Sequence, residues 1–217
     1  MKLLLKTDRY LLGRWKDALY QHIPGLEIVT FPFVGDPSDI EVVVAWEPPL
    51  GLLASMPNLK LVISTGAGVD HILKDPSYPA DVPLVRMVDP GLTQGMVEYV
   101  VIAALLCSRK MHRTFSAQAR KVWEPETTPL APEVTVGIMG MGVLGRACAG
   151  ALRGMGYNVI GWSRTPKEFD EVQNFDGLEG LEKFLPRTQV LICLLPLTAE
   201  TEGILGRGTF NRLPAGA

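Results

Sequence analysis

The sequence has little of what marks a disulfide framework, a membrane span or a nucleic-acid surface. It has only three cysteines in 217 residues, Cys107, Cys148 and Cys193, each inside an apolar run, so we expect buried reduced thiols and neither disulfides nor a metal site. Its 21 Lys and Arg residues against 23 Asp and Glu give a net charge of −2, which argues against an extended nucleic-acid surface. The longest apolar run, residues 97–107, is shorter than the roughly 18 residues of a membrane span, so we expect a buried core helix there and no membrane contact.

What is present is ordinary for a globular protein. Hydrophobic residues make up 47% of the chain and charged residues 20%, which excludes a disordered chain, a coiled coil and a collagen-like repeat. The apolar run at the N-terminus is too short for a signal peptide, so we expect a cytoplasmic protein. The length allows one large domain or two small ones.

Short β-branched runs alternate with amphipathic segments along the chain, which predicts parallel α/β layers. In the first half we expect strands at residues 2–5, 27–31, 41–45, 59–64 and 82–88, and helices at 11–22, 50–56 and 70–73. A long helix is then expected at 93–123, with a basic second half that we interpret as a solvated face rather than a partner or anion surface. After a proline-rich loop at 124–133, the pattern predicts strands at 134–139, 158–162 and 190–194 and helices at 143–155 and 178–185. Three strands are too few for a doubly wound sheet, so we expect this last segment to be incomplete.

A glycine-rich turn follows the strand expected at 134–139. Its sequence is Gly140-Met141-Gly142-Val143-Leu144-Gly145, and its position between a strand and a helix favours a dinucleotide-binding turn over a glycine-rich turn without a ligand. In such a turn the glycines permit tight backbone geometry and close approach to a pyrophosphate, which the helix N-terminus attracts.

The residues after the next strand bear on which dinucleotide is bound. An NAD site usually places Asp or Glu at the end of this strand, whereas this chain has Ser163, Arg164 and Thr165. The guanidinium and the two hydroxyls are suited to a 2′-phosphate, so we predict NADP as cofactor, with NAD disfavoured. A polar loop with a solvated arginine is the alternative. We expect Lys167 to be too solvated to decide the preference between NADP and NAD.

Two further loops follow apolar strands. Leu195 and Pro196, with Thr201 a few residues on, follow the last expected strand and would shape the adenosine side of the cofactor crevice. In the first half, residues 64–70 read Ser-Thr-Gly-Ala-Gly-Val-Asp. Their successive backbone N–H groups suit a small carboxylate, but the segment equally fits a tight turn in which Asp70 caps a helix.

Five motifs in this order resemble the D-isomer-specific 2-hydroxyacid dehydrogenase family, and in particular its glyoxylate/hydroxypyruvate reductase branch. They are Gly-Ala-Gly-Val-Asp at 66–70, Met-Val-Glu-Tyr at 96–99, the glycine turn at 140–145, Trp-Ser-Arg-Thr at 162–165 and Leu-Pro-Leu-Thr at 195–198, with Val-Ala-Trp-Glu-Pro-Pro at 44–49 supporting the branch. The resemblance implies a flavodoxin-like substrate domain at residues 1–92 and an incomplete Rossmann-type, doubly wound NAD(P)-binding domain at 93–217. It implies that Ala67, Gly68 and Val69 hold the substrate carboxylate and that Trp46 lines the pocket. It also implies that the long helix belongs to a homodimer interface.

The resemblance places the family's catalytic Arg, acidic residue and His beyond Ala217, so no catalytic residue is assigned in this chain. His22, His71 and His112 do not match the catalytic position, and we expect His71 to be a surface or helix-turn histidine. The implied activity of the complete protein is NADPH-dependent reduction of a small 2-ketoacid, and the 217-residue chain alone is expected to be inactive. The alternative is a non-catalytic, redox-sensing NAD(P)-binding module that binds a partner, since the same family includes corepressors.

Overall fold

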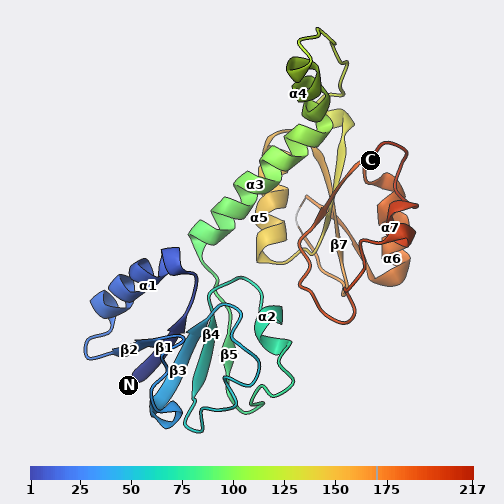
Figure 1. The fold of residues 1–217 in the computed structure, drawn as a ribbon. Coiled ribbons are helices and arrows are strands. Elements are labelled where there is room, and N and C mark those ends of the chain that lie inside the picture. The colour runs from blue at the N-terminus through green and yellow to red at the C-terminus, as the bar shows by residue number, and fades with distance from the viewer. Residues whose placement is uncertain (170) are drawn as a thin grey trace. The chain divides into compact units, whose positions relative to one another are not determined.

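The computed structural model describes residues 1–169 and 171–217, and it divides them into two compact units, Met1–Asp89 and Pro90–Ala217 (Figure 1). The division falls three residues before the boundary expected from the sequence. Both units contain parallel β-strands and helices, so the predicted α/β class is confirmed. Each unit is described by itself below.

The first unit is built on a five-stranded parallel sheet in the order β2-β1-β3-β4-β5. Its elements are β1 (Lys2–Lys6), α1 (Arg9–His22), β2 (Glu27–Thr30), β3 (Ile40–Ala45), β4 (Leu61–Ser64), α2 (Asp70–Leu73) and β5 (Leu84–Val85). Alternate residues of the central strands enter different cores, with Leu4 and Val43 in one and Leu3 and Val42 in the other. A sheet covered on both faces explains why these strands are apolar throughout.

Two expectations for this unit are wrong. Residues 50–56 form consecutive turns and no helix, with Gly51 at φ +79° and its N–H donated to the Asp75 carboxylate over 2.8 Å. The strand expected at 82–88 is reduced to the two residues of β5. In both cases a loop hydrogen-bonds to a distant part of the chain, which local periodicity does not report.

The second unit contains a four-stranded parallel sheet in the order β8-β7-β6-β9. Its elements are α3 (Pro90–Ser108), α4 (Met111–Ala119), β6 (Thr135–Met139), α5 (Val143–Gly154), β7 (Asn158–Ser163), β8 (Gln173–Asp176), α6 (Gly177–Phe184), β9 (Val190–Cys193) and α7 (Arg207–Phe210). Helices α3 and α5 share one hydrophobic core with residues of β6 and β7, and α6 shares a second core with residues of β6, β7 and β8. Figure 1 shows α5 and α6 on opposite sides of the sheet. Strand β8 was not predicted.

The helix expected at 93–123 is two helices, because Lys110 adopts a left-handed conformation with φ +50° between α3 and α4. The expectation of a buried core helix is also wrong for most of α3, where only Val100, Ala104 and Ser108 are buried. Helix α3 is long and apolar enough to cross a membrane by length and composition, with 17% of its most apolar window buried. Cys107, near its end, is exposed and so contradicts the expected burial, whereas Cys148 is buried, which raises the pKa of its thiol.

Candidate functional site

The glycine turn lies at the carboxyl end of β6 and leads into α5. Gly140 has φ +103°, a conformation that favours glycine, and its N–H donates to the Trp162 carbonyl over 2.9 Å. A Cβ on Gly145 would overlap the Gly140 carbonyl oxygen, so the helix can pack this closely against the turn only with glycine there. At Gly142, the residue before α5, a Cβ would meet nothing within 4 Å. Open space therefore faces the helix N-terminus, where unpaired N–H groups favour an anion.

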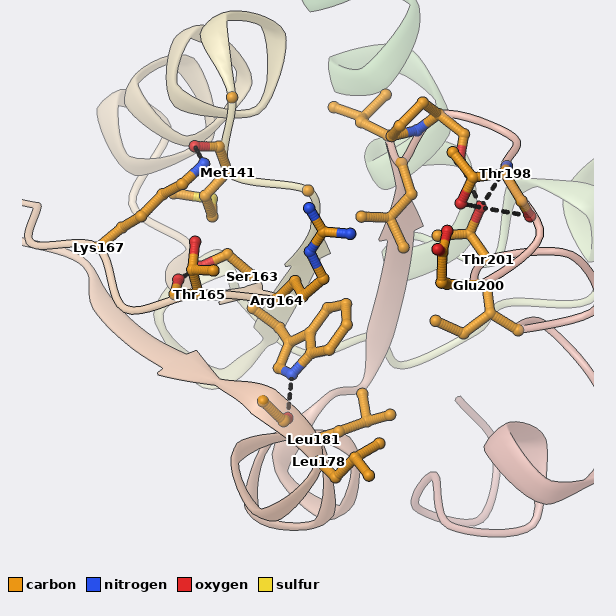
Figure 2. Close-up of a pocket in the computed structure, with 18 residues that line it drawn as sticks. Met141, Ser163, Arg164, Thr165, Lys167, Leu178, Leu181, Thr198, Glu200 and Thr201 are labelled. Atoms are coloured by element: carbon orange, nitrogen blue, oxygen red, sulfur yellow. Dashed lines mark hydrogen bonds between the residues drawn. The ribbon is translucent and has the colours of Figure 1, made fainter. Parts of the chain in front are cut away.

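A cavity of roughly 590 Å³ opens beside this turn (Figure 2). It brings together residues from the three segments singled out in this half of the sequence, namely Gly140, Met141, Gly142, Ser163, Arg164, Thr165, Leu195, Pro196 and Thr201. Val143, Leu144 and Gly145 do not line it. The remaining lining residues are Trp162, Lys167, Gly177, Leu178, Leu181, Leu194, Thr198, Glu200 and Ile204. A mostly apolar wall with a few convergent polar groups is the usual make-up of a cofactor site.

The loop after β7 is organised by hydrogen bonds that leave its arginine available. Ser163 is 4% exposed; its hydroxyl donates to the Thr165 carbonyl and accepts from the Asn174 amide, each over 2.9 Å. Within residues 1–169 and 171–217, no hydrogen bond or salt bridge engages the Arg164 guanidinium, and Figure 2 shows it pointing into the cavity. The loop is therefore braced at Ser163, and the cation next to it is free to meet an anion.

Charged residues on either side of Arg164 shape the field in the cavity. Lys167, expected to be too solvated to decide cofactor preference, is exposed; it lines the cavity and donates to the Met141 carbonyl over 3.4 Å. Glu200 lies on the opposite wall, where the Thr198 hydroxyl, the backbone and, to a smaller extent, Arg164 hold the pKa of its carboxyl below the ordinary value. Thr201 closes its own loop by donating to the Pro196 carbonyl over 2.5 Å and accepting from the Thr198 N–H over 2.8 Å.

The glycine turn, the open helix N-terminus and the apolar cavity fit a dinucleotide. The turn and the start of α5 would hold the pyrophosphate, and Arg164 would lie beside the adenine ribose. No carboxylate stands at the end of β7, where an NAD site usually has one.

In the first unit, three successive carbonyl groups of the loop after β4 accept hydrogen bonds from other residues of that unit. The Gly66 carbonyl accepts from the Met87 N–H over 3.0 Å, the Ala67 carbonyl from Arg86 over 3.4 Å and the Gly68 carbonyl from the Ser64 hydroxyl over 2.8 Å. In a trans peptide the N–H points away from the carbonyl, so the N–H groups of residues 67–69 are directed away from these donors. No acceptor contacts those three N–H groups within the described residues. Three successive N–H groups without an acceptor are suited to a small anion.

Trp46 and His71 lie beside this loop. The Trp46 indole is 37% exposed and packs on Gly66, where a Cβ would come within 2.5 Å of the ring. His71 is 5% exposed, so the expectation of a surface histidine is wrong, although it does lie in the short helix α2. Asp70 lies at the start of α2 without a capping hydrogen bond and places its carboxylate against Gly68. Burial lowers the pKa of His71.

Neither Asn174 nor the structural role of His71 was predicted from the sequence. Asn174 sits on the unpredicted strand β8, next to β7 in the sheet. His71 lies directly after the Gly-Ala-Gly-Val-Asp motif, which was the signal that could have drawn attention to it.

Comparison with known proteins gives a consistent set of relatives. Residues 101–217 match the family model described as D-isomer specific 2-hydroxyacid dehydrogenase, NAD binding domain. A glyoxylate/hydroxypyruvate reductase A from Yersinia enterocolitica is 40% identical over 209 residues, and one from Citrobacter koseri is 41% identical over 209 residues. Each alignment covers 94% of this chain and 66% of the relative, so the chain spans just under two thirds of the length of these curated relatives.

Solved structures resemble the chain along its length. A D-isomer specific 2-hydroxyacid dehydrogenase from Xanthobacter autotrophicus, in complex with NADPH and MES, is 38% identical with a TM-score of 0.90 and covers 99% of this chain and 70% of its own. An NADPH-dependent glyoxylate/hydroxypyruvate reductase from Sinorhizobium meliloti, in complex with NADP and sulfate, is 40% identical with a TM-score of 0.89, covering 100% and 71%.

Proposed function

The chain belongs to the D-isomer-specific 2-hydroxyacid dehydrogenase family, and on that premise we propose that the complete protein uses NADPH to reduce a small 2-ketoacid to the D-2-hydroxyacid. The names of the relatives from Yersinia and Sinorhizobium favour glyoxylate and hydroxypyruvate as substrates. The observation that carries the proposal is Arg164, an unpaired cation at the end of β7 inside the cavity that contains the glycine turn.

The cofactor part of the proposal follows from charge and hydrogen bonding. The open N-terminus of α5 would bind the pyrophosphate through backbone N–H groups. Arg164 would bind the 2′-phosphate with two charge-assisted hydrogen bonds, while Ser163 fixes the loop through the Thr165 carbonyl. When bound, the reduced nicotinamide supplies the two electrons of the reduction as a hydride equivalent.

The substrate part rests on the loop of the first unit. The N–H groups of Ala67, Gly68 and Val69 would hold the ketoacid carboxylate, and the exposed part of Trp46 would limit the space around its tail. His71 is not assigned as the proton donor, because both of its ring nitrogens are already hydrogen-bonded inside the protein. The chain's part in the reaction is thus to bind and orient the two reactants.

Two measurements test the proposal. Calorimetric titration should show tighter binding of NADPH than of NADH to the 217-residue chain. With the complete protein, hydroxypyruvate should oxidise NADPH, and chiral chromatography should identify the D-isomer as product, a distinction that glyoxylate does not offer because its product is achiral. Binding of NADPH without consumption of either ketoacid would favour the non-catalytic alternative, and absence of dinucleotide binding would contradict both.

A further inference from the structure

His71 is hydrogen-bonded at both ring nitrogens, and the two partners fix its protonation state. Nδ1 accepts from the Glu47 N–H over 3.1 Å, and Nε2 lies 2.9 Å from the Ser64 hydroxyl. A nitrogen that accepts from an N–H carries no proton, so the neutral ring is protonated at Nε2, which donates to Ser64.

Ser64 connects His71 to the loop at residues 66–69 by hydrogen bonds. Its oxygen accepts from His71 Nε2–H and from the Gly66 N–H, 3.1 Å away, and its own proton goes to the Gly68 carbonyl. Ser64 is buried, and its hydroxyl uses both lone pairs and its proton in these three hydrogen bonds. Because the Gly68 carbonyl is held toward Ser64, the Val69 N–H on the same peptide is directed away from it.

The other side of the ring constrains Trp46. The Trp46 and His71 rings pack with centroids 4.2 Å apart and planes at 37°. Glu47, the next residue, has φ +47°, which is unfavourable for a glutamate, and its N–H bond to His71 helps to hold that conformation. One imidazole is therefore linked to the loop at 67–69 through Ser64 and contacts the neighbouring Trp46 directly.

We propose that His71 is a positioning residue for the ketoacid site, in which a single neutral imidazole orients the carboxylate-binding N–H groups through Ser64 and the Trp46 side chain through Glu47. The inference rests on the proposed function, because it takes the loop and Trp46 as the substrate-binding surface. It adds a residue that touches neither substrate nor cofactor and that acts through two others.

Protonation of His71 would disrupt this arrangement. A proton on Nδ1 turns that nitrogen into a donor facing the Glu47 N–H, so the bond to Glu47 is lost. Burial opposes protonation and is the largest influence on the pKa of His71, the carboxylates of Asp70 and Glu47 favour protonation, and Lys74 opposes it. Burial prevails and keeps this pKa below its ordinary value of about 6.5, so the ring is neutral at neutral pH. The Nε2–H bond to Ser64 survives protonation. Carboxylate affinity should therefore be kept in mildly acidic solution, while the Glu47 N–H and the Trp46 side chain are released.

Two conservative variants separate the two contacts. His71→Asn places an amide oxygen where Nδ1 stands and keeps the bond to Glu47 but loses Ser64. His71→Gln places an amide N–H where Nε2 stands and keeps Ser64 but loses Glu47. His71→Phe loses both, and His22→Gln, at an exposed histidine, is the matched control.

The probe is oxamate, a stable 2-ketoacid mimic, titrated into the isotopically labelled chain and followed by the amide signals of residues 67–69 and the indole signal of Trp46. We expect His71→Asn to weaken oxamate binding by about tenfold, the value of one hydrogen bond of roughly 1.4 kcal/mol, and to keep the hydrogen-bonded amide signal of Glu47. His71→Gln should keep most of the affinity. It should also lose the change of the Glu47 amide and Trp46 indole signals between about pH 7.5 and pH 5.5 that the wild type and His22→Gln show.

Equal oxamate affinity in all three His71 variants, at every pH, would overturn the positioning role and leave the proposed substrate site intact. Absence of oxamate-dependent shifts at residues 67–69 in the wild type would instead overturn the substrate site, and the positioning role with it. If His71→Phe does not fold, the comparison of His71→Asn with His71→Gln decides the matter, because a purely structural histidine would give the two variants the same loss.

Discussion

Arg164 combines a position beside the predicted ribose site with the absence of any hydrogen-bonded partner in residues 1–169 and 171–217. Two charge-assisted hydrogen bonds to a phosphate are worth about 1.5–3 kcal/mol each, less the cost of desolvating and ordering the side chain. A net preference for NADPH of roughly 2–3 kcal/mol, or about 30- to 150-fold, follows from this balance.

Replacement of Arg164 by Ala should therefore lower NADPH affinity by about tenfold or more while NADH affinity changes little. Calorimetric titration of both dinucleotides measures the difference. Arg207→Ala, an exposed arginine that does not line the cavity, is the control and should leave both affinities unchanged. Equal losses for NADPH and NADH in the Arg164 variant would mean that the side chain supports the loop or the adenine.

Residues whose role depends on a neighbouring motif could be predicted from the sequence, and residues whose role depends on distant contacts could not. Gly140 and Arg164 were proposed because each follows an expected strand. His71 and Asn174 were not, because their partners lie 24 residues away at Glu47 and 11 residues away at Ser163. Which distant residues a fold brings together is a property of the sheet order, and no local pattern encodes it.

At the scale of elements, two of the three glycines of α5, Gly145 and Gly150, have opposite steric surroundings. At Gly145 a Cβ would overlap the backbone of Gly140, whereas at Gly150 it would meet nothing within 4 Å. The two positions lie in the same helix and so form an internal comparison.

We expect Gly145→Ala to destabilise the second unit by about 1–3 kcal/mol, because the glycine turn would have to move. Gly150→Ala should stabilise the unit by about 0.5–1 kcal/mol, since alanine is the better helix former. Urea unfolding of the two variants measures both values. A similar stability change in both would show that helix propensity, and not close packing against the turn, governs Gly145.

The elements that the sequence did not reveal have identifiable causes. The break at Lys110 lies in a run of basic and apolar residues without glycine or proline, so nothing local marked the end of α3. Strand β8 has the sequence Gln-Asn-Phe-Asp, in which only Phe175 is buried, and too little alternation remains to indicate a strand. The apolar strands β1, β3, β6 and β7 were predicted to within one residue at each end because two covered faces require continuous apolar runs.

At the scale of the whole chain, the two units have separate cores, and a change in pH should affect them differently. His71 belongs to the first unit, and burial lowers its pKa below the ordinary value of about 6.5. Between the folded pKa of His71 and about pH 6.5, the unfolded chain binds more protons than the folded chain. The contribution of neutral His71 to the stability of the first unit is therefore complete above about pH 6.5 and declines as the pH falls.

Calorimetry of the chain should accordingly show a first-unit transition that moves to lower temperature between about pH 7.5 and pH 5.5. His71→Gln should remove this His71 contribution, and the transition of the second unit serves as the reference. An identical pH response in wild type and variant would show that His71 does not link protons to folding.

Helix α3 exposes Tyr99, Ile102 and Leu106, at 69%, 55% and 37%, on one stripe at helical spacing. The family resemblance implies a homodimer, and we expect this stripe to be covered by a second copy. Ile102→Glu should shift sedimentation from dimer toward monomer, whereas Tyr20→Glu, an exposed aromatic on α1, should not. A wild-type chain that is monomeric at all concentrations, or that co-sediments with lipid vesicles, would contradict the dimer.

The freedom of the Arg164 side chain also has a consequence for how this protein could change over evolutionary time. Hydrogen bonds among Ser163, Thr165 and Asn174 hold the loop in place, and Arg164 takes part in none of them. A lineage could therefore exchange this one side chain, and with it the choice of electron donor, at little cost in stability. Cofactor preference is in this sense the most easily revised property of the site, and the glycine turn is among the least.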